Sequence, residues 1–92
     1  MSERKATIAS RVGLHARPAS LFAAAVGDLT LEVTIALEAD PAEDAMDASS
    51  ILSLMSLGAA NGDIVVLRAE GDGADEALES LVKLLETDLD AE

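Results

Sequence analysis

The stretch LEVTIAL at residues 31–37 decides the fold class of this 92-residue chain. Its aliphatic residues alternate with Glu32, Thr34 and Ala36, so a strand built from it has one apolar and one wet face. Such a strand belongs to an antiparallel sheet that is covered on one side only. The stretch therefore predicts an open-faced sheet with its helices packed against a single face.

Three further strands are expected around this stretch. Residues 6–9 predict a short first strand, and residues 45–48 can return as the second strand of a hairpin. The β-branched run IVVL at residues 64–67 predicts a central strand. Loop or turn signals separate the elements at residues 40–44, 61–63 and 70–73.

A first helix is predicted between a turn at residues 12–15 and Gly27. Pro18 fits its first turn, where a missing N–H has no partner to lose. Gly27 is expected in the C′ position, just beyond the helix. Four residues follow the spacing of one buried helical face: Ala19, Phe22, Ala23 and Val26.

Two more helices complete the pattern. A brief one is expected to begin at a cap made by Ser49 or Ser50, to run through Leu57 and to stop at Gly58. A final amphipathic helix has its apolar positions at Ala74, Ala77, Leu78, Leu81 and Leu85.

The resulting order, βαββαβα, predicts the α+β class and an open-faced β-sandwich, in which three helices cover one face of a four-stranded antiparallel sheet. Residues 1–92 are expected to form a single domain with a frayed tail at residues 88–92. Half of the residues are hydrophobic and Phe22 is the only aromatic one, so the core must be aliphatic. The absence of cysteine excludes disulfides and cysteine nucleophiles.

The net charge of −12 opposes binding to nucleic acid or to an anionic membrane face. The most apolar stretch, residues 14–26, is shorter than the roughly 20 residues that span a bilayer. No signal peptide is visible, so we expect no membrane insertion and a cytoplasmic location. Four of the six cations lie in residues 1–27, which indicates either an anion-handling region or a chance cluster in an acidic domain.

His15, the only histidine, lies at the predicted start of the first helix. Free N–H groups and the positive dipole end favour an anion there, and the Arg17 guanidinium offers donors suited to phosphate oxygens. A neutral imidazole can attack phosphorus, and the phosphohistidine would then face the backbone N–H groups of Ala16 and Arg17. The alternative is a lone histidine that caps the helix or is half exposed.

Other chemistries fit the sequence poorly. There is no nucleophile elbow and no phosphate-binding P-loop. The carboxylates at residues 40–47 miss the ligand order of an EF-hand and are interpreted as a solvated loop. No metal and no cofactor is predicted.

The segment SILSLMSLG at residues 50–58 does not keep its apolar residues to one helical stripe. Leu54 and Leu57 can pack inward together, which leaves Ile51, Leu52 and Met55 partly outside. An exposed apolar patch marks a partner site. The alternative is a short helix that is simply buried.

Two motifs together resemble a known family. The run GLHARPA at residues 13–19 resembles the active-site signature of the HPr family, the histidine phosphocarriers of the bacterial sugar phosphotransferase system. Residues 50–58 resemble the family's second signature, and the spacing, chain length and element order also fit. The resemblance covers essentially the whole chain.

The resemblance implies a stoichiometric carrier rather than a turnover enzyme. His15 would accept a phosphoryl group on Nδ1 from phosphorylated enzyme I and pass it to sugar-specific IIA domains, with assistance from Arg17. Ile51, Leu52 and Met55 fall on the family's apolar docking surface. Ser50 falls on its regulatory serine, which HPr kinase/phosphorylase modifies in some bacteria. A monomer is expected.

Three positions depart from the family pattern. Val12 stands where members often carry a polar side chain, so backbone N–H groups must bind more of the phosphoryl group. Ser49 replaces a common basic residue, and Ser53 replaces a common glycine. Two rival functions stay open: a regulatory binding module that acts through residues 50–57, and a nitrogen-related paralogue of the same carrier.

Overall fold

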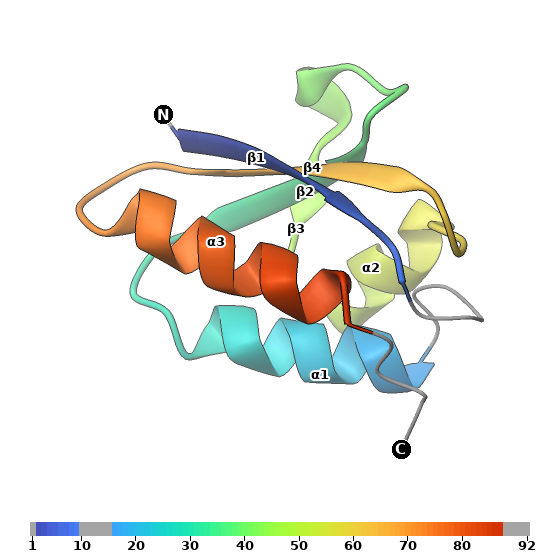
Figure 1. Ribbon diagram of the computed structural model, residues 1–92, viewed down its shortest axis with the longest axis horizontal. Helices are drawn as coiled ribbons and strands as arrows, with labels where there is room; N and C mark the ends of the chain where they lie inside the picture. The colour runs from blue at the N-terminus through green and yellow to red at the C-terminus, as the bar shows by residue number, and fades with distance from the viewer. Residues whose placement is uncertain (1, 10–15, 88–92) are drawn as a thin grey trace.

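The four strands form one antiparallel sheet. The structure is a computed structural model that describes residues 2–9 and 16–87 (Figure 1). The strands lie in the order β1-β4-β2-β3, so β4 is central as predicted. Their bounds are Ser2–Thr7 for β1, Val33–Leu37 for β2, Met46–Asp47 for β3 and Ile64–Ala69 for β4.

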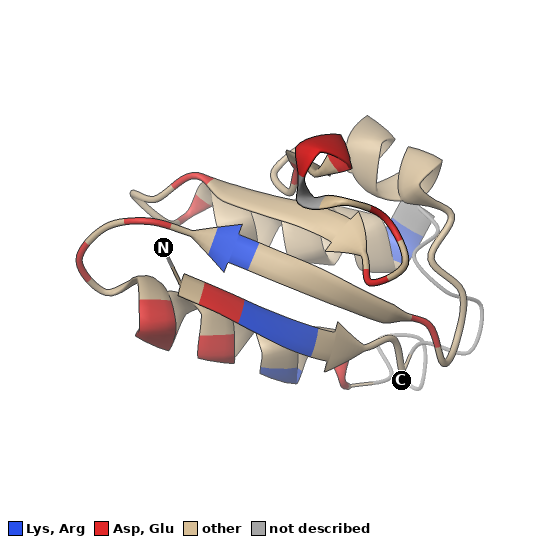
Figure 2. Cartoon of the chain, turned by 90° about the horizontal axis from the view of Figure 1, so that it is seen from above, with Lys and Arg blue, Asp and Glu red and all other residues tan. Residues whose placement is uncertain are grey.

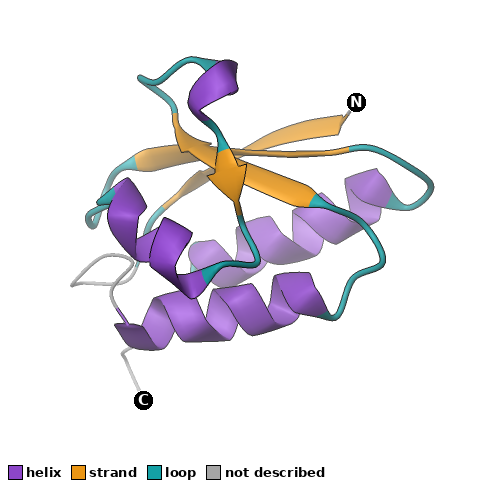
Figure 3. Ribbon diagram, turned by 180° about the vertical axis from the view of Figure 1, so that it is seen from behind, coloured by secondary structure: helices purple, strands orange, loops and turns teal. Residues whose placement is uncertain are grey.

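Among the described residues, three α-helices cover one face of this sheet and one 3₁₀ turn lies on the other side (Figure 3). The predicted α+β open-faced sandwich and its βαββαβα order are therefore confirmed. The helices are α1 (Ala16–Gly27), α2 (Ile51–Leu57) and α3 (Ala74–Leu85), and the 3₁₀ turn is η1 (Ala42–Asp44).

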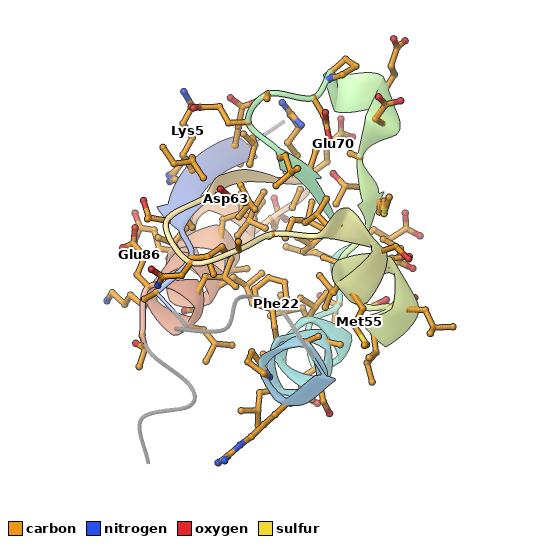
Figure 4. All side chains as sticks on the ribbon, turned by 90° about the vertical axis from the view of Figure 1, so that its right-hand side faces the viewer. Lys5, Phe22, Met55, Asp63, Glu70 and Glu86 are labelled. Carbon is orange, nitrogen blue, oxygen red and sulfur yellow. The ribbon has the colours of Figure 1, made fainter. Side chains whose placement is uncertain are left out.

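The core lies between the sheet and the helices. Each α-helix contributes the face that its apolar spacing predicts, and Phe22 points from α1 toward the sheet (Figure 4). The other members of the core cluster are aliphatic, because the chain has no second Phe, Tyr or Trp. The largest fully buried residues are Phe22, Ile8, Ile35, Leu54, Leu67, Leu78, Val33, Val65 and Pro18.

The first strand begins earlier than the sequence indicates. Residues 6–9 were the expected strand, whereas β1 runs from Ser2 to Thr7. The first residues of β1 are polar and have low strand propensity. Nevertheless, β1 pairs with β4 from Ser2 to Thr7. Arg4 is further held by an ion pair of 3.3 Å to Asp75. Tertiary pairing therefore outweighs local preference here.

The expectation for Gly27 is wrong. This residue is the last one inside α1 and does not adopt the left-handed conformation, which four other glycines of the described ranges do. The Asp28 N–H donates to the Ala24 carbonyl at 3.2 Å, so the helical path continues past Gly27. The Leu29 N–H then donates to the Val26 carbonyl at 3.0 Å. Because these bonds close the last turn, no positive φ is required.

The wet face of the sheet is only partly wet. Ala36 was expected there as a solvated residue, yet it is 1% exposed, and its neighbour Val66 on β4 is 5% exposed. Val66 also pairs with Lys5 on the other side. The Lys5 ammonium lies 2.9 Å from a Glu38 carboxylate oxygen, so this ion pair spans β4 on the open face. The pKa of Lys5 is raised, chiefly by its hydrogen bond with Glu38.

A second ion pair lies in the neighbouring row of the open face. Arg68 Nε on β4 donates to a Glu3 carboxylate oxygen on β1 at 2.8 Å. Figure 2 shows these charged segments side by side on the strands. The open face is thus covered by paired side chains instead of by helices.

Candidate functional site

The first turn of α1 combines a helix dipole end with a cation. The helix begins at Ala16, and its first turn contains no acidic residue. Pro18 is fully buried, while Arg17 is exposed. The first N–H groups of a helix have no acceptor within it, so this end attracts anions. The predicted position of Arg17 at such an end is confirmed.

His15 lies outside the described residues, as do the turn at residues 12–15 and the tail at residues 88–92. In the sequence it directly precedes Ala16, the first residue of α1. Its role as phosphoryl acceptor, and those of the Ala16 and Arg17 N–H groups, therefore stay predictions.

The start of α2 decides between the two candidate caps. Ser50 is the N-cap residue, with extended φ and ψ of −98° and 117°, and its hydroxyl oxygen accepts from the Ser53 N–H at 3.3 Å. At the other end Gly58 adopts a left-handed φ of 70°, as predicted. Both ends of this short helix are thus fixed by local bonds.

Ser49 does not cap the helix but forms hydrogen bonds with Asp47. Its hydroxyl donates to an Asp47 carboxylate oxygen at 2.6 Å, and its backbone N–H donates to the same oxygen at 2.9 Å. These two bonds lower the pKa of Asp47, the side-chain bond being the larger cause. The sequence predicts a solvated acidic segment and a short strand around Asp47, but not this role. The Asp-x-Ser spacing, typical of an Asx turn, is the signal that could have indicated it.

The exposed side of α2 is apolar. Leu54 and Leu57 are buried at 0% and 8% exposure, as expected. Ile51, Leu52 and Met55 are 42%, 78% and 44% exposed, which contradicts the alternative of a fully buried helix. We call these three residues the α2 patch.

The α2 patch and the start of α1 lie on one side of the molecule. The two helices pack against each other. Figure 1 shows the N-terminal end of α1 beside α2, and Figure 4 faces this side, with Met55 next to α1. The fold therefore brings together two segments separated by more than 30 residues in the sequence.

The N-terminal cations do not form one anion-binding patch. Arg4 and Lys5 lie on β1 and are paired with acidic side chains, Lys5 with Glu38 and Arg4 with Asp75 and Glu79. Arg11 lies outside the described residues. The broader basic region expected at residues 1–27 is thus divided between the sheet and the start of α1.

Two features bear on other site types. Within residues 2–9 and 16–87, no group of three or more acidic, cysteine or histidine side chains is arranged to hold a metal ion. In the same part of the chain, no helix has the length and apolar character needed to cross a bilayer.

The fold and this site define a class: a small open-faced α+β sandwich in which an anion-attracting helix start adjoins a short helix with an exposed apolar side. The family profile described as "PTS HPr component phosphorylation site" matches residues 2–87. The chain belongs to the HPr family of phosphocarrier proteins of the phosphotransferase system.

Relatives and solved structures agree with this assignment. The phosphocarrier protein HPr of Streptomyces coelicolor is 42% identical over 85 residues, which cover 92% of this chain and 88% of that protein. The crystal structure of HPr-C-His from Thermoanaerobacter tengcongensis has a TM-score of 0.84 at 36% identity, with 100% of this chain and 99% of that chain covered.

A further relative has a different name, and a further HPr structure is a dimer. The phosphocarrier protein NPr of Shewanella violacea is 33% identical over 88 residues, which cover 96% of this chain and 92% of that protein. An HPr dimer from T. tengcongensis has a TM-score of 0.65 at 37% identity and 94% coverage of both chains. The expectation of a monomer is therefore left untested by these likenesses.

Proposed function

We propose that His15 accepts a phosphoryl group from phosphorylated enzyme I and passes it to sugar-specific IIA domains. The observation that carries this proposal is the exposed Arg17 at the start of α1, two residues after the histidine in the family signature. The lone pair on the neutral His15 Nδ1 attacks phosphorus. A P–N bond forms as the bond between phosphorus and enzyme I breaks, and the reverse exchange occurs on the IIA domain.

The environment of the helix start suits a carrier. A phosphoryl group must be formed and released with little net change in free energy, so the site should stabilise it only modestly. An exposed helix N-terminus together with one arginine contributes about 1–2 kcal/mol toward an anion. The Arg17 guanidinium adds charge-assisted hydrogen bonds, which an exposed side chain can make and break. Partner proteins then supply positioning in the transition state.

The α2 patch is the surface on which enzyme I and the IIA domains dock in this proposal. Three exposed apolar side chains in one short helix favour brief complexes with a small buried area. The chain acts in the cytoplasm as a monomer, without a cofactor, and is consumed and regenerated stoichiometrically.

A nitrogen-related branch is the second candidate, because one relative is named NPr. Both candidates use the same His15 chemistry and differ only in the partner enzymes. Transfer rates from the enzyme I of each branch distinguish them.

Incubation of the chain with enzyme I and labelled phosphoenolpyruvate tests the proposal. We expect acid-labile label on this chain and its onward transfer when a IIA domain is added. Absence of label would refute the carrier function and leave a regulatory binding module on the same fold.

A further inference from the structure

A cavity of about 410 Å³ lies at the C-terminal end of α1. It is bounded by the last turn of that helix, the beginning of β2 and the turn that leads into α2. Residues from these three elements include Val26 and Gly27, Glu32 and Thr34, and Asp47 and Ser49.

Three negative features converge on this cavity. The carbonyl groups at the C-terminal end of a helix carry a partial negative charge. The last turn of α1 contains no basic residue that would balance this charge. Glu32 and Asp47 are exposed and make no ion pair within the described ranges, whereas Glu3 and Glu38 are paired. The bonds from Ser49 keep Asp47 ionised. The cavity therefore favours a positively charged group.

The position of the cavity links it to the α2 patch. Asp47 and Ser49 directly precede the cap of α2, so the acidic rim adjoins Ile51 in the chain. Arg17 lies at the opposite end of α1, ten residues before Gly27, which corresponds to about 15 Å along a helix. The surface that includes α1 and the α2 patch thus has a cation, Arg17, at the start of α1 and two carboxylates, Glu32 and Asp47, near its end. Helix α2 itself contains no charged residue.

We infer that enzyme I, docked on the α2 patch, presents a lysine or arginine side chain to Glu32 and Asp47. The inference rests on the proposed function, since it names the chemistry of the surface that this partner must offer. A basic group there complements the local charge, fixes the orientation of the complex and favours encounter with a carrier of net charge −12. An acidic group in the same place would be repelled.

The test measures KM and kcat for phosphoryl transfer from enzyme I to the carrier at low salt. Glu32→Gln is the primary variant, because Glu32 makes no hydrogen bond within the described residues that its loss could break. Glu43→Gln in η1 is the matched control: it removes the same charge from a residue that does not line the cavity, on the 3₁₀ turn at the open side of the sheet (Figure 3). Asp47→Asn is a secondary variant, because it also alters the turn into α2.

We expect Glu32→Gln to raise KM by about threefold with kcat unchanged, as one rim charge allows. Glu43→Gln should leave KM within about 1.5-fold of the parent, and high salt should remove the difference between the variants. Equal KM values for Glu32→Gln and Glu43→Gln would overturn the inference while the carrier function stands. Failure of the unmodified chain to accept label would overturn both.

Discussion

The hydroxyl oxygen of Ser50 accepts a hydrogen bond from the backbone N–H of Ser53 at 3.3 Å, so the residue that matches the family's regulatory serine is also the N-cap of α2. A phosphate at this position would still accept helix N–H groups, and α2 should therefore survive modification. It would, however, add about two negative charges next to the α2 patch. Asp47, three residues earlier, is already ionised there.

The first prediction concerns the approach of enzyme I to this helix. Ser50→Asp should lower the rate of His15 phosphorylation by a few-fold without unfolding the chain, because aspartate is also a good N-cap. Leu52→Glu should lower it more strongly, since Leu52 is the most exposed member of the α2 patch at 78%. Enzyme I titrations and thermal melts measure both effects.

Ser80→Glu is the control for this prediction. It adds one negative charge on an exposed position of α3, away from α2. If Leu52→Glu and Ser80→Glu gave the same rate, total charge alone would be responsible. Parent rates in both Ser50→Asp and Leu52→Glu would return residues 50–57 to a structural role.

The second prediction concerns Arg17. Its side chain is exposed at the start of α1, so it should stabilise the transferring phosphoryl group more than it stabilises the fold. We expect Arg17→Glu to slow transfer by at least about tenfold, which is roughly 1.4 kcal/mol in barrier. The melting temperature should stay near that of the parent. Lys83→Glu, an equal charge change in α3, should affect transfer far less; lost stability with unchanged transfer would make Arg17 a structural residue.

The third prediction concerns the phosphoryl acceptor. His15→Ala should fold normally but accept no acid-labile label from enzyme I. Acid-labile label on the parent can be assigned to His15, because the chain has one histidine. Phosphorus NMR of the labelled parent should place the group on Nδ1. Acid-labile label on the variant would disprove the assignment.

Elements determined by nearby residues could be predicted from the sequence. The buried face of α1, the Ser50 cap and the stop at Gly58 each depend on contacts within a few positions. The outward direction of Leu52 follows from the same helical spacing.

Features that depend on distant partners could not be predicted. The start of β1 at Ser2 requires pairing with Ala69, 67 residues away in the sequence. The burial of Ala36 requires a neighbouring strand and an ion pair that joins Lys5 to Glu38. At the site, the cavity beside Asp47 exists only because α1, β2 and the turn into α2 meet there.

The last prediction concerns pH. The bonds from Ser49 lower the pKa of Asp47 in the folded chain below its unfolded value. A carboxyl group of this kind stabilises the fold above its unfolded pKa, near 4, and this contribution is lost as the pH falls through the folded pKa. Ser49→Ala removes the side-chain bond, the larger cause of the shift, and should raise the pKa of Asp47 toward its ordinary value. Carboxyl-carbon NMR titration of Asp47 measures this change.

The same variant should show a linked effect on stability. Ser49→Ala should lower the free energy of unfolding at neutral pH, and its difference from the parent should shrink as Asp47 becomes protonated in both proteins. Because the Asp47 carboxylate is exposed, the loss should be small, and urea unfolding at neutral and at acidic pH should resolve its pH dependence. Ser80→Ala, which removes an exposed hydroxyl from α3, should leave the Asp47 titration unchanged. An Asp47 pKa that does not move in Ser49→Ala would show that the backbone bond alone holds the turn into α2.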